Sequence, residues 1–187
     1  GHDENRSKSR VVKDENGINY GTRQGRSKPD NFSTDEMVAT VKALAEVMKA
    51  EDPNHLISAG YSVPRKSAWH LRASPEWNGG DWTPDTKEEM EAYVELTNPD
   101  PIDLVSVHFY NSGNDNERFG ISGQFNPDLL KAYVDAANRI EKPLFVGEFG
   151  DGEPTVSEER SANFTRRTAL KILELAVPVS TLWAWQF

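Results

Sequence analysis

Four short apolar runs alternate along the chain with longer segments whose apolar residues recur at helical spacing. The runs cover 55–60, 102–110, 143–150 and 179–187, and they are apolar at consecutive positions rather than at every second one. Strands of this kind are covered on both faces, as in a parallel sheet with crossover helices. The pattern therefore predicts an α/β fold.

The helices expected between these runs begin at recognisable capping sequences. Ser33-Thr-Asp-Glu36 and Thr155-Val-Ser-Glu158 have the pattern of capping boxes, whereas Thr83-Pro84 and Asn126-Pro127-Asp128 place proline near a first helical turn. Three of the helices have apolar stripes that we expect to face the core: Met37, Val41, Leu44, Ala45 and Met48; Leu129, Leu130, Tyr133, Val134, Ala137 and Ile140; and Phe164, Thr168, Ile172 and Leu175.

Polar and aromatic side chains follow the apolar runs at their carboxyl ends. Glu148 ends one run between Gly147 and Gly150, and His108 and Tyr110 end another. The last run carries two indoles, Trp183 and Trp185. A carboxylate is costly to bury without partners or a task, and α/β barrels present their catalytic residues at the carboxyl ends of the strands.

The length sets a limit on this barrel. The 187 residues suffice for one domain, but a complete eight-stranded barrel takes about 250 residues. Four strands would leave two sheet edges uncovered, at about 1–3 kcal/mol for each buried and unpaired backbone group. We therefore expect a single domain, 1–187, that forms the carboxyl-terminal half of a larger (β/α)8 barrel. Residues 1–31, polar and without an apolar period, are expected as a long loop.

Composition excludes several classes of function. A net charge of −9 disfavours nucleic acid as a partner, since phosphate binding needs clustered Lys and Arg. No apolar stretch approaches the roughly 20 residues of a membrane-spanning helix. Cysteine is absent and the four histidines show no ligand spacing, so we predict neither a metal site nor a cofactor. Asp85, Glu88, Glu89 and Glu91 are interpreted as a solvated helix face.

Four motifs in register resemble the retaining glycoside hydrolases of the cellulase and endo-β-mannanase superfamily, of the family-5 type in clan A. They are Asp52-Pro-Asn-His-Leu-Ile-Ser58, Val107-His-Phe-Tyr110, Lys142-Pro-Leu-Phe-Val-Gly-Glu-Phe-Gly150 and Leu182-Trp-Ala-Trp-Gln-Phe187. They are similar to the family's strands five, six, seven and eight. The resemblance implies that 1–31 follows strand four.

The resemblance also implies roles for individual residues. Glu148 matches the nucleophile, with His108 and Tyr110 beside it. In His2-Asp-Glu-Asn-Arg6, Glu4 matches the acid/base, and Asp3 stands where the family has the Asn that binds substrate. Retaining hydrolysis uses two carboxylates about 5–5.5 Å apart. Glu148 must be ionised to attack, whereas Glu4 must hold a proton, which a nearby negative charge favours.

The tryptophans are candidates for sugar binding, because an indole offers a flat apolar face. The resemblance favours Trp185 for the first subsite, with Trp183 on the same side of the strand, and one of the two is expected only to pack. Trp69, Trp77 and Trp82 lie in a long loop, 61–82, where they could stack on further sugars or fix the loop. Glu148 as a structural ion-pair member and His108 as a core histidine remain open alternatives.

The function that the resemblance implies is retaining hydrolysis of β-linked glucan or mannan. The partners would be a polysaccharide or oligosaccharide and the missing amino-terminal half-barrel, on the same or a separate chain. The family also implies a secreted or periplasmic location. One alternative is a non-catalytic carbohydrate-binding barrel that has lost its acid/base, because the Asn-Glu pair is not intact. Another is a different barrel enzyme with fortuitous strand ends.

Overall fold

The computed structural model describes residues 31–75, 79–110, 118–121, 127–150 and 157–183, together with the strands at 12–13 and 19–20. Residue contacts divide the chain into two compact units, Gly1–Ser33 and Thr34–Phe187. In the first unit, β1 (Val12–Lys13) and β2 (Asn19–Tyr20) pair antiparallel. This short ladder lies in the segment that the sequence predicted as a loop. The assignment of 1–187 to one domain stays a prediction.

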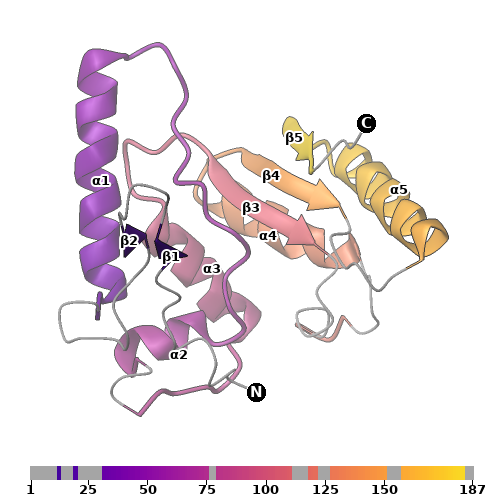
Figure 1. Cartoon of the computed structure of the whole chain (residues 1–187), viewed down its shortest axis with the longest axis horizontal. Helices are drawn as coiled ribbons and strands as arrows, with labels where there is room; N and C mark the ends of the chain where they lie inside the picture. The colour runs from indigo at the N-terminus through magenta and orange to yellow at the C-terminus, as the bar shows by residue number, and fades with distance from the viewer. Residues whose placement is uncertain are drawn as a thin grey trace. The chain divides into compact units, whose positions relative to one another are not determined.

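A three-stranded parallel sheet forms the centre of the second unit (Figure 1). Its strands are β3 (Val105–Tyr110), β4 (Leu144–Gly150) and β5 (Val179–Leu182), in that order across the sheet. The strand expected at 55–60 is reduced to one parallel bridge between Ser58 and Leu104, next to β3. The four predicted segments therefore lie side by side in chain order, as consecutive strands of an α/β barrel do.

The helices connect these strands. They are α1 (Thr34–Glu51), α2 (Ala68–Ala73), α3 (Lys87–Thr97), the 3₁₀ helix η4 (Pro127–Leu129), α4 (Leu130–Arg139) and α5 (Glu158–Glu174). Figure 1 shows α4 behind β3 and β4. The short helix α2 lies in the segment that the sequence predicted as a loop. Among the described residues, no helix is both long and apolar enough to cross a membrane.

Two helix starts differ from the prediction. The N-cap of α3 is Thr86, whose hydroxyl accepts from the Glu89 amide while the Glu89 carboxylate accepts from the Thr86 amide. This reciprocal pair moves the helix start past Thr83-Pro84. The N-cap of α5 is Ser157, and its third position is Arg160, which has no carboxylate to complete a capping box. Thr155 lies outside the described residues.

The core lies between the sheet and helices α3, α4 and α5. Its members include Met90, Val107, Leu130, Tyr133 and Val146, each at most 1% exposed. The apolar stripes predicted for α4 and α5 face this core: Leu129, Leu130, Tyr133 and Ala137 are buried, as are Phe164, Thr168 and Ile172. Each fully buried large side chain contributes about 1.5–3 kcal/mol. The middle of the sheet is therefore well covered.

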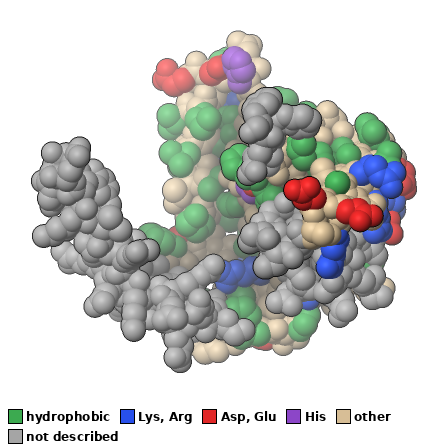
Figure 2. Space-filling view, turned by 45° about the vertical axis from the view of Figure 1, so that its right-hand side comes forward, with side chains coloured by type: hydrophobic (Ala, Val, Ile, Leu, Met, Phe, Trp, Pro, Cys, Tyr) green, Lys and Arg blue, Asp and Glu red, His purple; other side chains and the backbone are tan. Residues whose placement is uncertain are grey.

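The apolar stripe predicted for α1 is mostly exposed, contrary to expectation. Ala45 packs with Ile57 and Ile102, but Leu44 is 60% exposed and Met48 is 54% exposed. Figure 2 shows hydrophobic side chains along α1. We call this set the α1 margin: Met37, Leu44, Val47, Met48 and Leu56. A second exposed set, the β5 margin, comprises Leu170, Leu173, Val179 and Leu182. An amphipathic pattern identifies the apolar face of a helix but not what covers it.

Candidate active site

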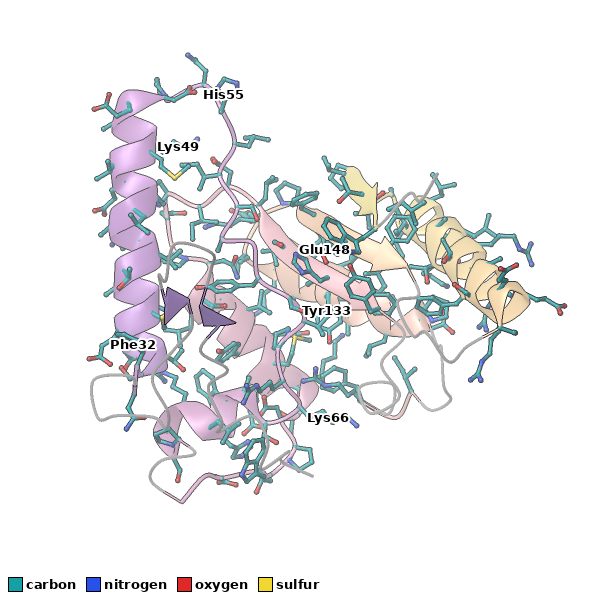
Figure 3. All side chains as sticks on the ribbon, in the orientation of Figure 1. Phe32, Lys49, His55, Lys66, Tyr133 and Glu148 are labelled. Atoms are coloured by element: carbon teal, nitrogen blue, oxygen red, sulfur yellow. The ribbon has the colours of Figure 1, made fainter. Side chains whose placement is uncertain are left out.

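The ends of β3 and β4 bring together the three side chains that the sequence singled out. The Tyr110 hydroxyl donates to Oε2 of Glu148 at 2.5 Å, and Nδ1 of His108 lies 3.4 Å from the same oxygen. Figure 3 shows Glu148 over the sheet at β3 and β4. The side chains of His108 and Glu148 are each about one quarter exposed. Glu148 is therefore a partly buried carboxylate with a directed donor.

A β-bulge in β4 creates this arrangement. Val107 pairs with Val146 and His108 with Glu148, so Gly147 is an extra residue on the β4 side. A bulge changes the direction of the side chain that follows it, and here it sets Glu148 opposite His108. A Cβ atom on Gly147 would lie 3.3 Å from the His108 ring, and Oγ1 of Thr181 donates to the Gly147 carbonyl. Glycine at this position lets the imidazole approach the strand.

Gly150 has a similar role where β4 meets β5. Its φ is +154°, and a Cβ atom there would lie 2.3 Å from the Trp183 carbonyl oxygen. The Trp183 amide donates to the Phe149 carbonyl at 2.9 Å, which extends the pairing beyond β5. Trp183 is 60% exposed. The close contact at Gly150 thus holds a solvent-facing indole beside the strand end that carries Glu148.

Electrostatics favour Tyr110 as a hydrogen-bond donor. Burial raises the pKa of the Tyr110 phenol well above its usual value, and the hydrogen bond to Glu148 and its negative charge raise it further. Both factors oppose ionisation of the phenol. Tyr110 therefore keeps its proton over the whole physiological range and offers it to Glu148.

Several predicted site residues fall outside the described part of the chain. They are Asp3, Glu4, Trp77 and Trp185. Trp69 is described: it lies on α2, partly buried, with the guanidinium of Arg72 5.4 Å from its ring centroid. Trp82 is 47% exposed. The catalytic and substrate-binding roles of all these residues stay predictions.

Sequence reasoning missed Arg118, which ties two loops together. Arg118 is 5% exposed, and its guanidinium donates to the carbonyls of Pro64 and Arg65 and to the Tyr133 hydroxyl. Pro64 and Arg65 precede α2, whereas Arg118 lies in the segment after β3. An isolated arginine in a polar loop carries no sequence signal for such a contact, because its acceptors are backbone carbonyls distant along the chain.

Of the acidic residues near α3 that the sequence assigned to a solvated face, Glu88 is exposed, whereas Asp85, Glu89 and Glu91 are not, contrary to that interpretation. The Asp85 side chain is fully buried and lies 2.8 Å from Nδ1 of His70, and Glu89 lies 3.6 Å from Nε2 of the same ring. Glu91 is mostly buried and pairs with Arg139 at 2.9 Å. Aspartate two residues before a helix gives no sign that it will bind residues on another helix.

His70, Asp85 and Glu89 can each offer one ligand atom within 4.8 Å of the others, the one such group in the described part of the chain. Their donors and acceptors already satisfy one another, and Asp85 also accepts from the Trp69 amide at 3.0 Å. Mutual pairing explains this assembly without a cation. We interpret it as an ion-pair cluster.

The family model for cellulases of glycosyl hydrolase family 5 matches residues 16–187. The chain belongs to glycosyl hydrolase family 5. An Arabidopsis thaliana protein named "Putative mannan endo-1,4-beta-mannosidase P" is 28% identical over 126 residues, which are 64% of this chain and 28% of that protein.

Two solved structures of mannanases share the fold. The endo-1,4-beta-mannanase from Rhizomucor miehei superposes on 87% of this chain with a TM-score of 0.53 and 19% identity. The endo-beta-1,4-mannanase from Thermotoga petrophila superposes on 80% with a TM-score of 0.50 and 19% identity. The chain spans 40% and 31% of these two proteins. Its fold is that of the carboxyl-terminal half of a (β/α)8 barrel, as predicted.

Proposed function

We propose that this chain forms the nucleophile-bearing half of a retaining glycoside hydrolase that cleaves β-1,4-linked mannan or glucan. The observation that carries the proposal is the 2.5 Å hydrogen bond from Tyr110 to Glu148 at the carboxyl ends of adjacent parallel strands. In a barrel these ends form the catalytic face. Membership of family 5 and the mannosidase name of the Arabidopsis relative favour this chemistry.

In the first step, an ionised oxygen of Glu148 attacks the anomeric carbon and the glycosidic C–O bond breaks. Glu4 gives its proton to the departing oxygen, so the leaving sugar departs as an alcohol. In the second step, Glu4 takes a proton from water, whose oxygen attacks the same carbon and releases Glu148. The configuration at the anomeric carbon is retained after two inversions.

Tyr110 and His108 would hold Glu148 for this attack. The bond from the Tyr110 hydroxyl occupies Oε2 and leaves Oε1 as the nucleophilic atom. A hydrogen bond to a carboxylate favours its charged form. One of Trp185 and Trp183, with Trp185 favoured, would supply the flat apolar surface against the sugar, with Trp69 and Trp77 as contacts for more distant units.

The two margins support a missing amino-terminal half-barrel as the other partner. The α1 margin belongs to the helix before the first strand segment of this chain and to the start of that segment, and the β5 margin belongs to its last strand and to the helix before it. These are the two positions at which a half-barrel must meet the rest of a closed barrel. Because a polysaccharide substrate lies outside the cell, we also infer that the protein is exported.

A Glu148→Gln variant of the complete barrel tests the function. The amide cannot act as the nucleophile, so hydrolysis of mannan and β-glucan should fall by about 10⁴-fold or more. Glu174→Gln is the control, because Glu174 is 63% exposed and pairs only with Lys171 in the contacts described. A 2-fluoro-sugar inactivator should label Glu148 covalently. Near-normal hydrolysis by Glu148→Gln would refute the role, and sugar binding without labelling or turnover would favour the binding barrel.

A further inference from the structure

A cluster of one histidine and two carboxylates joins the two ends of the segment that carries Trp69 and Trp82. Nδ1 of His70 on α2 lies 2.8 Å from Oδ1 of Asp85, and its Nε2 lies 3.6 Å from Oε1 of Glu89 on α3. The Asp85 side chain is fully buried, whereas that of His70 is 23% exposed. A carboxylate so placed needs a cation or several donors.

The charges around His70 are negative on two sides. Asp81 and Asp85 face it from the segment before α3, and Glu89 faces it from α3 itself. Arg72, also on α2, turns elsewhere: it pairs with Asp35 of α1 at 2.9 Å and stacks over Trp69. A neutral imidazole can donate from only one nitrogen, whereas the imidazolium donates from both. Only the contact with Asp85 is a hydrogen bond, and Glu89 lies at an ion-pair distance, so a carboxylate beside each ring nitrogen favours protonated His70.

The same cluster organises the backbone of the segment 66–86 in its described parts, 66–75 and 79–86. Asp85 accepts hydrogen bonds from the amides of Trp69 and His70, at 3.0 and 3.4 Å, in the first turn of α2. The Ser67 hydroxyl donates to the Trp82 carbonyl at 2.8 Å. The backbone of Trp69 is thus bound by Asp85, and the backbone of Trp82 is bound by Ser67, two residues before Trp69.

This segment is joined to the catalytic side of the sheet. The Ser106 hydroxyl donates to the Tyr61 carbonyl at 3.0 Å, and Arg118, from the loop after β3, binds the carbonyls of Pro64 and Arg65. These contacts place residues 61–65, which lead into the segment, beside β3, the strand that carries His108 and Tyr110. The segment itself starts at Lys66 and contains the cluster.

We propose that the Asp85–His70–Glu89 cluster is a positioning element of the sugar-binding face, in which protonated His70 fixes the described residues 66–75 and 79–86 so that Trp69 and Trp82 meet the substrate. The inference rests on the proposed function for its substrate. Loss of the His70 proton removes the pairing with Glu89 and weakens the closure of the segment. Affinity for sugar, rather than the chemical step, is then the quantity that changes.

The direction of the pH effect follows from His70. Its hydrogen bond with Asp85 raises the pKa of His70 above 6.5, aided by the charges of Glu89, Asp81 and Asp85 and opposed by partial desolvation. A group whose pKa is higher in the folded state stabilises that state fully below its unfolded pKa. The contribution is lost as the pH rises through the folded value. The cluster therefore holds the segment fully at acid pH, and this contribution is lost as the pH rises through the pKa of His70 in the folded protein.

The test compares His70→Gln with wild type in the complete barrel. Hydrogen exchange over 66–86, corrected for intrinsic rates, is measured at about pH 5.5 and about pH 8. In wild type the protection of this segment from exchange should fall severalfold from the lower to the higher pH. In His70→Gln the protection should be low at both pH values. Glu89→Gln keeps a side chain that can cap α3. It should reduce the difference in protection between the two pH values. His55→Gln is the control, since His55 forms the other histidine–aspartate pair, with exposed Asp52.

Kinetics with mannan and cello-oligosaccharides supply the second readout. The KM of His70→Gln should be severalfold higher than that of wild type at about pH 5.5 and about equal to it at about pH 8. The ratio of kcat should stay near one at both. A wild-type exchange response in His70→Gln, or a KM ratio of one at both pH values, would overturn the proposal. Failure of Glu148 labelling would overturn the proposed function instead, while the exchange result would still decide whether the cluster closes the segment.

Discussion

Leu130 on α4 and Leu44 on α1 are the same residue type on the apolar stripes of two helices, yet Leu130 is fully buried and Leu44 is 60% exposed. Leu130 lies over the middle of the sheet. It belongs to a core cluster that includes residues of β3, β4, α3 and α5. Leu44 lies on the α1 margin. Sequence pattern identifies both stripes equally well, whereas their burial depends on which neighbours are present. The difference is consistent with the proposed half-barrel, in which the missing half would cover the two margins.

The largest effect expected from this contrast concerns core stability. Leu130→Ala should lower the free energy of unfolding of the complete barrel by about 2–5 kcal/mol, because it leaves a cavity in a packed core. Leu44→Ala should cost more than about 1 kcal/mol if the missing half covers the α1 margin, since an exposed substitution changes stability by only about 0.5 kcal/mol. Urea unfolding with unchanged m-values measures both. A Leu44→Ala variant as stable as wild type would contradict the half-barrel interpretation.

The strand-end site offers the next largest effect. Tyr110→Phe removes the donor to Glu148 while retaining the ring, and hydrogen bonds to charged groups are worth about 1.5–3 kcal/mol. We therefore expect kcat/KM to fall by about 10- to 150-fold. The free energy of unfolding, measured in parallel, separates this from loss of folding. Activity within about twofold of wild type would show that the contact is structural.

The backbone at the end of β4 gives a third test. Gly150→Ala places a Cβ atom 2.3 Å from the Trp183 carbonyl oxygen, in addition to the strain of a φ of +154°. Gly60→Ala has a φ of +68° but no atom within 4 Å of the added Cβ, so it carries strain alone. Strain of this kind costs about 1–3 kcal/mol. Gly150→Ala should therefore lower the melting temperature more than Gly60→Ala, and an equal shift would contradict the close contact.

The strand ends could be predicted from sequence because their signals are local. Continuous apolar runs locate β3 and β4, and the carboxyl ends of parallel strands share one edge, so His108, Tyr110 and Glu148 were expected together. The bulge at Gly147 was not predicted. It depends on how β4 pairs with β3 and β5, and a glycine in a strand is consistent with several arrangements.

The region around α2 could not be predicted for a different reason. Six residues make a marginal helix by themselves, and the carboxylate that binds the first turn of α2 comes from Asp85, fifteen positions after His70. The same contact buries Asp85, which composition alone assigns to a solvated face. Long-range polar contacts between side chain and backbone have no period, so periodicity cannot reveal them.

The smallest expected effect lies where α1 meets the sheet. Asp103 accepts from the Ile57 amide at 2.7 Å and pairs with Lys49 of α1 at 2.9 Å. Although partial burial opposes it, the bonds from Lys49 and Ile57 lower the pKa of Asp103 below its usual 3.8. Its charged form therefore stabilises the fold above pH 3.8, and this contribution is lost as the pH falls through the lower, folded value.

Asp103→Asn should thus lower the free energy of unfolding by about 1 kcal/mol at neutral pH. The asparagine oxygen can still accept from the Ile57 amide, so the loss reports the charge. The gap between variant and wild type should narrow as the pH falls below 3.8. Asp100→Asn is the control, because Asp100 pairs with Lys142 but is 95% exposed, and its effect should be near zero. A gap that is the same at neutral and acid pH would mean that α1 is held at this edge by shape and hydrogen bonding, and that the Lys49 charge contributes nothing.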